Sequence, residues 1–265
     1  MTEKSDFPRY DHPVLAWEYD QRQPAPFPGE LDWYLKYIAL SDSPILELTC
    51  GSGRLTIPLA VAGFQIDGVD RSKAMLKRLS DKLTTYDEKV RQRVRLFCAD
   101  MIDFVPEGMH GCILLPYNSL QYLETVKNVS ICFRRIATFL NAGGYFLFVV
   151  RRLNLSSFTY GKRVAYDSMD NPIADKEKKL SVGSRFVSNI DLSEHRVITE
   201  QTFRILHNSG ETEQIRQVTY EPIIEVVDYI RMLERAGFDT KVNGGYNEQP
   251  DDGKSHELCF VCQKR

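Results

Sequence analysis

The sequence lacks the features that would place this chain in a membrane or on a nucleic acid. No apolar run approaches the roughly 18 residues that a transmembrane helix needs, and the opening segment MTEKSDFPRYDHP has no apolar stretch of the signal-peptide kind. The formal net charge is -2 at pH 7, so no large positive field attracts nucleic acid or an anionic lipid surface. We therefore expect a soluble, cytoplasmic protein that acts on a small molecule, with neither nucleic acid nor membrane as a partner.

Cysteine and histidine are too few and too scattered for a disulfide framework or a zinc site. Four of the six cysteines fall in or beside expected core elements, where a thiol behaves as a small hydrophobe: Cys50, Cys98, Cys112 and Cys132. Cys259 and Cys262 form a C-x-x-C, but in an expected strand this odd spacing points them to opposite faces. None of the five histidines has the spacing of zinc ligands, so we expect no metal.

What remains is the composition of an ordinary globular protein. The chain has 265 residues, of which 43% are hydrophobic and 26% charged. That length can bury a substantial core as one domain with an insertion.

Residues 44–152 alternate short apolar runs with helical stretches, which is typical of a parallel sheet with crossover helices. Five strands are expected at 45–48, 64–70, 94–100, 112–116 and 144–150, and helices at 54–62, 72–83 and 126–140. We predict a doubly wound, Rossmann-like α/β fold with a mostly parallel seven-stranded sheet.

The flanking segments have different patterns. Residues 1–43 form an aromatic-rich N-terminal arm with a helix at 31–40, either a lid or a simple surface anchor. Residues 153–221 contain stretches that alternate with period two (185–190, 196–206 and 211–220), which predict an antiparallel β meander inserted between strands five and six. This insertion would form a wall of the acceptor site or a homodimer interface. Residues 222–265, with a helix at 224–236, would add the last two strands.

A glycine turn follows the first strand, in ELTCGSGR. Gly51 and Gly53 let the backbone approach a ligand closely, but dinucleotide-binding domains carry a similar turn. Glu47, just before the turn, would repel a pyrophosphate and attract a sulfonium or an ammonium. The charge therefore favours a cationic methyl donor over NAD.

Two further carboxylates end the second and third strands. Asp70 is placed to accept hydrogen bonds from ribose hydroxyls, and Asp100, followed by Met101, to receive an adenine amino group. Each acid by itself could equally be a helix cap; their order at successive strand ends favours one shared ligand.

The segment ILELTCGSGRLTIPLAVAGFQIDGVDRSKAML, with CADMIDF after it, resembles the class I S-adenosylmethionine-dependent methyltransferases, particularly their bacterial small-molecule branch. The resemblance covers roughly residues 15–150 and implies S-adenosyl-L-methionine as cofactor and S-adenosyl-L-homocysteine as product. It implies that Glu47, Gly51 and Gly53 surround the methionine part, that Asp70 binds the ribose, and that Asp100 with Met101 binds adenine. It also implies cofactor contacts for Met75, Leu115, Tyr19 and Arg54, the last two at the methionine carboxylate.

Two positions depart from the family pattern. Thr49 stands where a glycine is usual, and as a β-branched residue it narrows the turn or needs an ordinary φ. Arg71 replaces the more usual apolar residue after the ribose acid, where it covers the adenosine or faces solvent.

The acceptor is expected beside the loop LPYNSLQYL after the fourth strand, because ligands of open α/β sheets lie at the carboxyl ends of the strands. Tyr117 and Asn118 are the catalytic candidates that would touch the acceptor. Other candidates for acceptor binding come from this loop, the arm and the end of the fifth strand: Gln121, Tyr122, Tyr10 and Arg152. Whether Arg151 or Arg152 faces the ligand stays open, with Arg152 preferred.

We therefore predict an enzyme that transfers a methyl group to nitrogen or oxygen of a small molecule. The loop holds no obvious base, which favours nitrogen. Three alternatives stay open: a nucleic-acid or protein methyltransferase, an NAD-binding oxidoreductase, and a module that binds the cofactor without turnover.

Overall fold

The computed structural model describes residues 10–40, 43–153 and 162–265, and these fall into two compact units. One unit contains Tyr10–Leu120, Val126–Arg152 and Ile224–Arg265. The other contains Gln121–Thr125 and the described residues of Leu153–Ile223. Each unit is considered by itself below.

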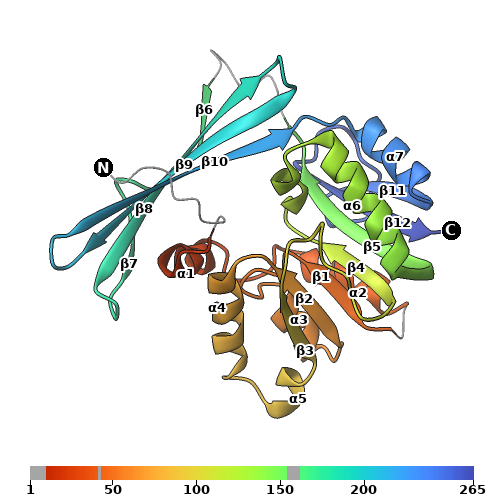
Figure 1. Cartoon of the computed structure of the whole chain (residues 1–265), viewed down its shortest axis with the longest axis horizontal. Helices are drawn as coiled ribbons and strands as arrows, with labels where there is room; N and C mark the ends of the chain where they lie inside the picture. The colour runs from red at the N-terminus through yellow and green to blue at the C-terminus, as the bar shows by residue number, and fades with distance from the viewer. Residues whose placement is uncertain (1–9, 41–42, 154–161) are drawn as a thin grey trace. The chain divides into compact units, whose positions relative to one another are not determined.

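The first unit is built on a seven-stranded sheet, which confirms the predicted architecture (Figure 1). The strand order is β11-β12-β5-β4-β1-β2-β3, and β12 runs antiparallel to both of its neighbours. The strands are β1 (Ile45–Leu48), β2 (Ile66–Asp70), β3 (Val94–Cys98), β4 (His110–Leu115), β5 (Leu140–Arg151), β11 (Phe238–Gly244) and β12 (Glu257–Lys264). From β1 the chain winds outward to β3 and then returns to β4 on the other side of β1, so the topological switch point lies between β1 and β4.

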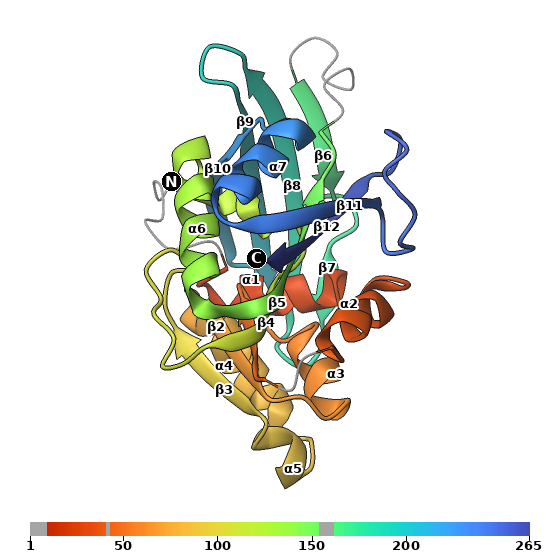
Figure 2. The same cartoon turned by 90° about the vertical axis from the view of Figure 1, so that its right-hand side faces the viewer.

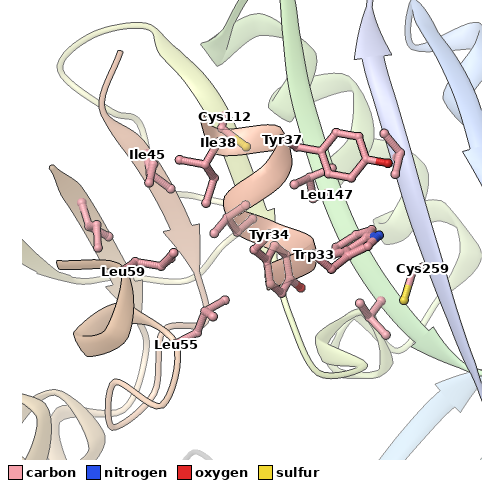
Figure 3. Close-up of a cluster of buried hydrophobic side chains, with 14 of the residues drawn as sticks. Trp33, Tyr34, Tyr37, Ile38, Ile45, Leu55, Leu59, Cys112, Leu147 and Cys259 are labelled. Atoms are coloured by element: carbon pink, nitrogen blue, oxygen red, sulfur yellow. The ribbon is translucent and has the colours of Figure 1, made fainter. Parts of the chain in front are cut away.

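The helices of this unit cover both faces of the sheet. They are α1 (Pro13–Arg22), α2 (Glu30–Ile38), α3 (Thr56–Val61), α4 (Lys73–Leu83), α5 (Glu88–Arg91), α6 (Val126–Phe139) and α7 (Val226–Arg235). Aromatic residues of α2, among them Trp33, Tyr34 and Tyr37, pack against inward-facing residues such as Cys112 and Leu147 (Figure 3). Burial of these side chains removes a large apolar area from water and fixes α2 on the sheet.

The opposite face of the same strands carries a second aromatic layer. Phe146 and Phe148 alternate with Leu147 along β5, and both lie within 6 Å, centroid to centroid, of Phe133 on α6. The ring of Phe148 stacks on Phe260 of β12. Helices α6 and α7 lie next to each other (Figure 2).

The second unit contains an antiparallel sheet of five strands. It has the order β10-β9-β8-β6, with β7 also paired to β8. The strands are β6 (Lys162–Asp167), β7 (Ile173–Asp175), β8 (Leu180–Asp191), β9 (Arg196–His207) and β10 (Thr212–Pro222). Three of them correspond to the predicted meander, although β8 begins before the expected 185, and the short strands β6 and β7 were not predicted.

Helix α1 was also not predicted. Pro13 occupies its first turn, where the missing N–H costs no hydrogen bond, and His12 caps it by accepting from the Val14 N–H. Its buried residues include charged ones, Glu18 and Asp20, so the helix has no clean apolar stripe that a periodicity argument would detect.

The cysteines follow the expectation with one exception. Cys259 packs in the core cluster with α2, and alternation along β12 puts Cys262 on the other face. Cys98 is exposed, because it ends the edge strand β3. Among the described residues, no helix is long and apolar enough to span a membrane.

Candidate functional site

The predicted site residues of the first unit gather at the carboxyl ends of the parallel strands. The glycine turn follows β1, and Pro116–Asn118 follow β4, so the two segments flank the switch point. Ligands of open α/β sheets bind at this position because the connections diverge there.

Both glycines of the turn have left-handed backbone conformations. Gly51 has φ 56° and Gly53 has φ 86°, values that other residues adopt only with strain. A Cβ on Gly53 would come within 2.2 Å of Leu79 Cδ1, whereas one on Gly51 would meet nothing within 4 Å. Gly53 is therefore required for packing against α4, and Gly51 leaves open space at the turn.

The backbone conformation of Thr49 differs from one of the two expected from the sequence. Its φ is 58°, so the prediction that a β-branched residue would need an ordinary φ is wrong. Thr49 Oγ1 lies 2.8 Å from Ser119 Oγ and 2.6 Å from the Leu48 carbonyl, and its single proton can be donated to either oxygen. Ser119 Oγ in turn donates to the Pro116 carbonyl at 2.7 Å. These hydrogen bonds join the loop after β1 to the loop after β4 and offset the strain of the backbone.

Glu47 is buried at the end of β1, with 1% of its surface exposed. Burial raises the pKa of its carboxyl group to about 8, although Thr56 and Arg54 act in the opposite direction. Thr56 Oγ1 donates to Glu47 Oε2 at 2.7 Å. With a pKa of about 8, the buried Glu47 carboxyl group is largely neutral at pH 7. A cation placed next to it would favour the carboxylate.

Asp70, at the end of β2, links the glycine turn to the start of α4. Its Oδ2 accepts the Gly51 N–H at 2.9 Å, and its Oδ1 accepts the Ser72 N–H at 2.8 Å. Burial nevertheless raises the pKa of Asp70 above its ordinary value. Each carboxylate oxygen can accept a second hydrogen bond, so the group retains acceptor capacity for hydroxyls.

The residues that follow β3 are more exposed than Glu47 and Asp70 at the ends of β1 and β2. Asp100 accepts the Ile102 N–H at 2.9 Å and lies 3.7 Å from Arg71, and both side chains are substantially exposed. Met101 is half-buried beside Asp100. Met75, in the first turn of α4, is buried and Leu115, the last residue of β4, is fully buried.

Tyr117 and Asn118 have consecutive left-handed conformations, with φ 55° and 54°. The Asn118 amide oxygen accepts the Arg151 N–H at 2.9 Å, and its own N–H donates to the Val149 carbonyl at 2.9 Å. Asn118 therefore fastens the loop to the end of β5, and this fixes the direction of the neighbouring Tyr117 side chain.

Tyr117 is one of four aromatic side chains whose rings form a row. Phe27 lies 5.4 Å from Tyr117 and Tyr19 lies 6.5 Å from it, with Tyr10 a further 5.2 Å from Tyr19. Three of the residues predicted for the site, Tyr10, Tyr19 and Tyr117, are thus brought together, and Phe27 is an addition that the sequence did not suggest.

Arg54 is buried beneath this row and paired with Glu30. Two guanidinium nitrogens donate to the two carboxylate oxygens of Glu30, one of them at 2.8 Å. The guanidinium carbon lies 5.0 Å from the Phe27 ring centroid and 5.3 Å from that of Tyr117. Burial lowers the pKa of Arg54, but the hydrogen bonds and charge attraction to Glu30, together with the nearby Tyr19 and Tyr34, raise the pKa on balance above its ordinary value, so the side chain is always charged.

Arg152 is held by two residues near the C-terminal end of the chain. Its Nε donates to the Ser255 carbonyl at 3.0 Å and its Nη2 to Asp251, both in the segment between β11 and β12. Arg151 is exposed. Gln121 and Tyr122 are half-buried and belong to the second unit.

Sequence reasoning missed the residues that support the glycine turn: Asp20, Phe27, Glu30, Ser52 and Thr56. Asp20 is adjacent in sequence to Tyr19, and Glu30 follows the turn signal PFPG at a helix start. Nothing in the sequence indicates that either carboxylate contacts a residue of the glycine turn.

Residues 45–144 match the family model described as a methyltransferase domain. Over 239 residues the chain is 27% identical to a protein of Bacillus subtilis (strain 168) named "Putative methyltransferase YqeM", covering 88% of this chain and 90% of that one.

Three solved structures share the fold. A S-adenosylmethionine-dependent methyltransferase from Clostridium acetobutylicum ATCC 824 is 17% identical with a TM-score of 0.74, covering 95% of this chain and 98% of that one. The sugar N-methyltransferase KedS8 from Streptoalloteichus sp ATCC 53650 is 17% identical with a TM-score of 0.75, and the match covers 100% of this chain and 97% of that one. CalS10, an amino pentose methyltransferase from Micromonospora echinaspora solved with the cofactor bound, is 15% identical with a TM-score of 0.66 over the whole of both chains.

Of the two cofactors left open by the glycine turn, the match to a methyltransferase domain favours S-adenosylmethionine over NAD. Residues 45–144 of the chain are therefore similar to a methyltransferase domain, and the chain has the Rossmann-like fold of the solved methyltransferases.

Proposed function

We propose that the protein transfers the methyl group of S-adenosylmethionine to an amine nitrogen of a small, amino-sugar-like acceptor. The single observation that carries the choice of nitrogen is the chemistry of the loop after β4. The loop carries Tyr117 and Asn118, and the Asn118 amide oxygen already accepts the Arg151 N–H.

The glycine turn would hold the methionine part of the cofactor. Gly51 leaves open space at its Cα, and Glu47 would supply a complementary negative charge once a sulfonium and an ammonium next to it favour the carboxylate. Asp70 would receive the ribose hydroxyls through its remaining acceptor capacity, and Asp100 would face the adenine. The buried Met75 and Leu115 would supply apolar surface beside the nucleoside.

The row of Tyr10, Tyr19, Phe27 and Tyr117 would provide the apolar, electron-rich surroundings that suit a cationic methyl donor. Aromatic faces attract sulfonium and ammonium groups through their quadrupoles. Arg54 does not cancel this attraction, because Glu30 neutralises it at hydrogen-bond distance.

The reaction is an in-line displacement. The lone pair of a neutral amine forms a bond to the methyl carbon while the carbon–sulfur bond breaks, and its electron pair returns to sulfur. The products are S-adenosylhomocysteine and a methylated ammonium, which gives its proton to water. Because a neutral amine carries its own nucleophilic lone pair, the protein's main task is positioning, which can contribute roughly 7 to 11 kcal/mol.

A hydroxyl acceptor would need a base to remove its proton during attack. Pro116, Tyr117 and Asn118 carry no carboxylate, imidazole or amine. The structural relatives KedS8 and CalS10 are described as sugar N- and amino pentose methyltransferases, which supports an amino sugar as the substrate class.

The test is a paired acceptor screen with methyl-labelled S-adenosylmethionine. Amino sugars are offered beside the matching sugars that carry a hydroxyl at the same carbon, and mass spectrometry locates the label. We expect label on nitrogen, and no transfer to the hydroxyl partners. Transfer to oxygen alone would exclude the amine proposal, and transfer to added RNA or protein would exclude a small-molecule acceptor.

A further inference from the structure

The side chains of the glycine turn are held by three carboxylates from three different elements. Ser52, Arg54 and Thr56 alternate along the turn and the start of α3. Each donates to a buried acid, and the acids are Asp20 of α1, Glu30 of α2 and Glu47 of β1. Two of these three carboxylates therefore come from the N-terminal helices, outside residues 45–144 that match the methyltransferase family model.

Asp20 joins α1 to the turn and to α4. Only 8% of its surface is exposed, and its carboxylate accepts from Ser52 Oγ, from Arg78 Nε at 2.7 Å and from Lys82 Nζ at 3.1 Å. Two cations, Arg78 and Lys82, therefore balance the charge of one buried acid. The Ser52 hydroxyl therefore has a strong, charge-assisted acceptor in a fixed position.

Glu30 joins α2 to the turn in the same way. It is fully buried at the first position of the helix, where the helix dipole favours a negative charge. Besides Arg54, it accepts the Phe27 N–H at 2.8 Å. Glu30 thus fixes both Arg54 and the backbone of Phe27, whose ring contacts Tyr117.

The turn needs such support because its two glycines are conformationally free. Gly51 and Gly53 lose more backbone freedom than other residues when they adopt one conformation. Ser52 lies between them and Arg54 follows them, so the hydrogen bonds to Asp20 and Glu30 act at the positions where the chain would otherwise move.

We propose that Asp20 and Glu30 are positioning residues of the cofactor site, which hold the turn in its binding conformation. Cofactor binding and the packing of α1 and α2 on the turn are then linked: each favours the other. This inference rests on the proposed location of the cofactor at the glycine turn.

The test measures affinity for S-adenosylhomocysteine by titration calorimetry, in the full chain, for Asp20→Asn, Glu30→Gln and Ser52→Ala. Asn and Gln keep the size of the acids but remove the charge. We expect Kd to rise at least tenfold in both, about 1.4 kcal/mol, and severalfold in Ser52→Ala, which removes one hydroxyl only. The control is Asp81→Asn, whose acid pairs with Lys77 on the exposed side of α4 and should not alter Kd.

A double variant separates positioning from general destabilisation. If Asp20 acts through Ser52, Asp20→Asn combined with Ser52→Ala loses no more affinity than the weaker-binding single variant. Hydrogen exchange supplies a second readout, since S-adenosylhomocysteine should slow amide exchange in α1 of the wild type and not of Ser52→Ala.

Ser52→Ala removes a single hydroxyl and should not unfold the chain. It therefore tests whether Asp20 positions the turn even if an acid variant fails to fold. Kd values within twofold of the wild type in Ser52→Ala and in every folded acid variant would overturn the inference, as would losses that simply add in the double variant. A wild type that does not bind S-adenosylhomocysteine would instead overturn the proposed function itself.

Discussion

Glu47 and Thr56 lie on opposite sides of the glycine turn, and Thr56 Oγ1 donates to Glu47 Oε2 at 2.7 Å. The pair is buried, and the pKa of Glu47 rises to about 8 because burial disfavours the carboxylate. Between its ordinary value of 4.5 and 8, the folded protein therefore holds a proton at Glu47 that the unfolded chain has released. More protons in the folded state mean that the free energy of unfolding falls as the pH rises through this window.

Glu47→Gln should remove that part of the pH dependence. The amide keeps an acceptor for Thr56 but cannot ionise, so the variant should be more stable than the wild type above pH 8, by on the order of a few kcal/mol, and similar to it near pH 5. Urea denaturation at several pH values measures the difference. Glu107→Gln is the control, since Glu107 is exposed beside Arg95; an equal response in both variants would show that the Glu47 proton is not responsible.

Cofactor binding should release a proton near neutral pH. A sulfonium and an ammonium next to Glu47 favour its carboxylate, so affinity should increase from pH 6 to 8 and the binding heat should depend on the ionisation enthalpy of the buffer. Calorimetry in phosphate and in Tris at pH 7 measures the number of protons released. We expect more release with S-adenosylmethionine than with its uncharged-sulfur product, and none in Glu47→Gln; identical heats in both buffers for the wild type would contradict the prediction.

Asp70→Asn should weaken cofactor binding at least tenfold while leaving the fold intact. The amide has one oxygen where the carboxylate has two, so it cannot accept from both Gly51 N–H and Ser72 N–H and still receive ribose hydroxyls. Fluorescence or calorimetric titration gives Kd, and circular dichroism checks the fold. Affinity equal to that of the wild type would remove Asp70 from the cofactor site.

The two glycines of the turn should respond differently to alanine. Gly53→Ala places a Cβ 2.2 Å from Leu79 Cδ1 at φ 86°, and should lower the free energy of unfolding by about 2 kcal/mol or more. Gly51→Ala meets no atom, so it should cost only the left-handed strain, about 1 to 2 kcal/mol, but should reduce cofactor affinity by filling the open space. Thermal and urea unfolding rank the two; equal destabilisation would show that packing against Leu79 is unimportant.

Most of the sheet was predictable because its signals are local. Strands such as 45–48 and 144–150 are short apolar runs, and the helices between them carry periodic apolar residues. Their alternation implies a parallel sheet, and the order of Glu47, Gly51, Gly53, Asp70 and Asp100 along it implies one ligand. The strands of the second sheet were found by their period-two pattern, except β6 and β7, which are too short to show one clearly.

The sequence by itself therefore determined the architecture and the order of the strand-end residues, because backbone periodicity and glycine content are properties of neighbouring residues. Only the tertiary structure decided how the turn is held. Asp20 and Glu30 lie 32 and 24 residues from Ser52 and Arg54, and the left-handed Thr49 is stabilised by Ser119, 70 residues away. Hydrogen bonds between distant side chains leave no periodic trace in a sequence, since they depend on which faces of two elements the packed core brings together.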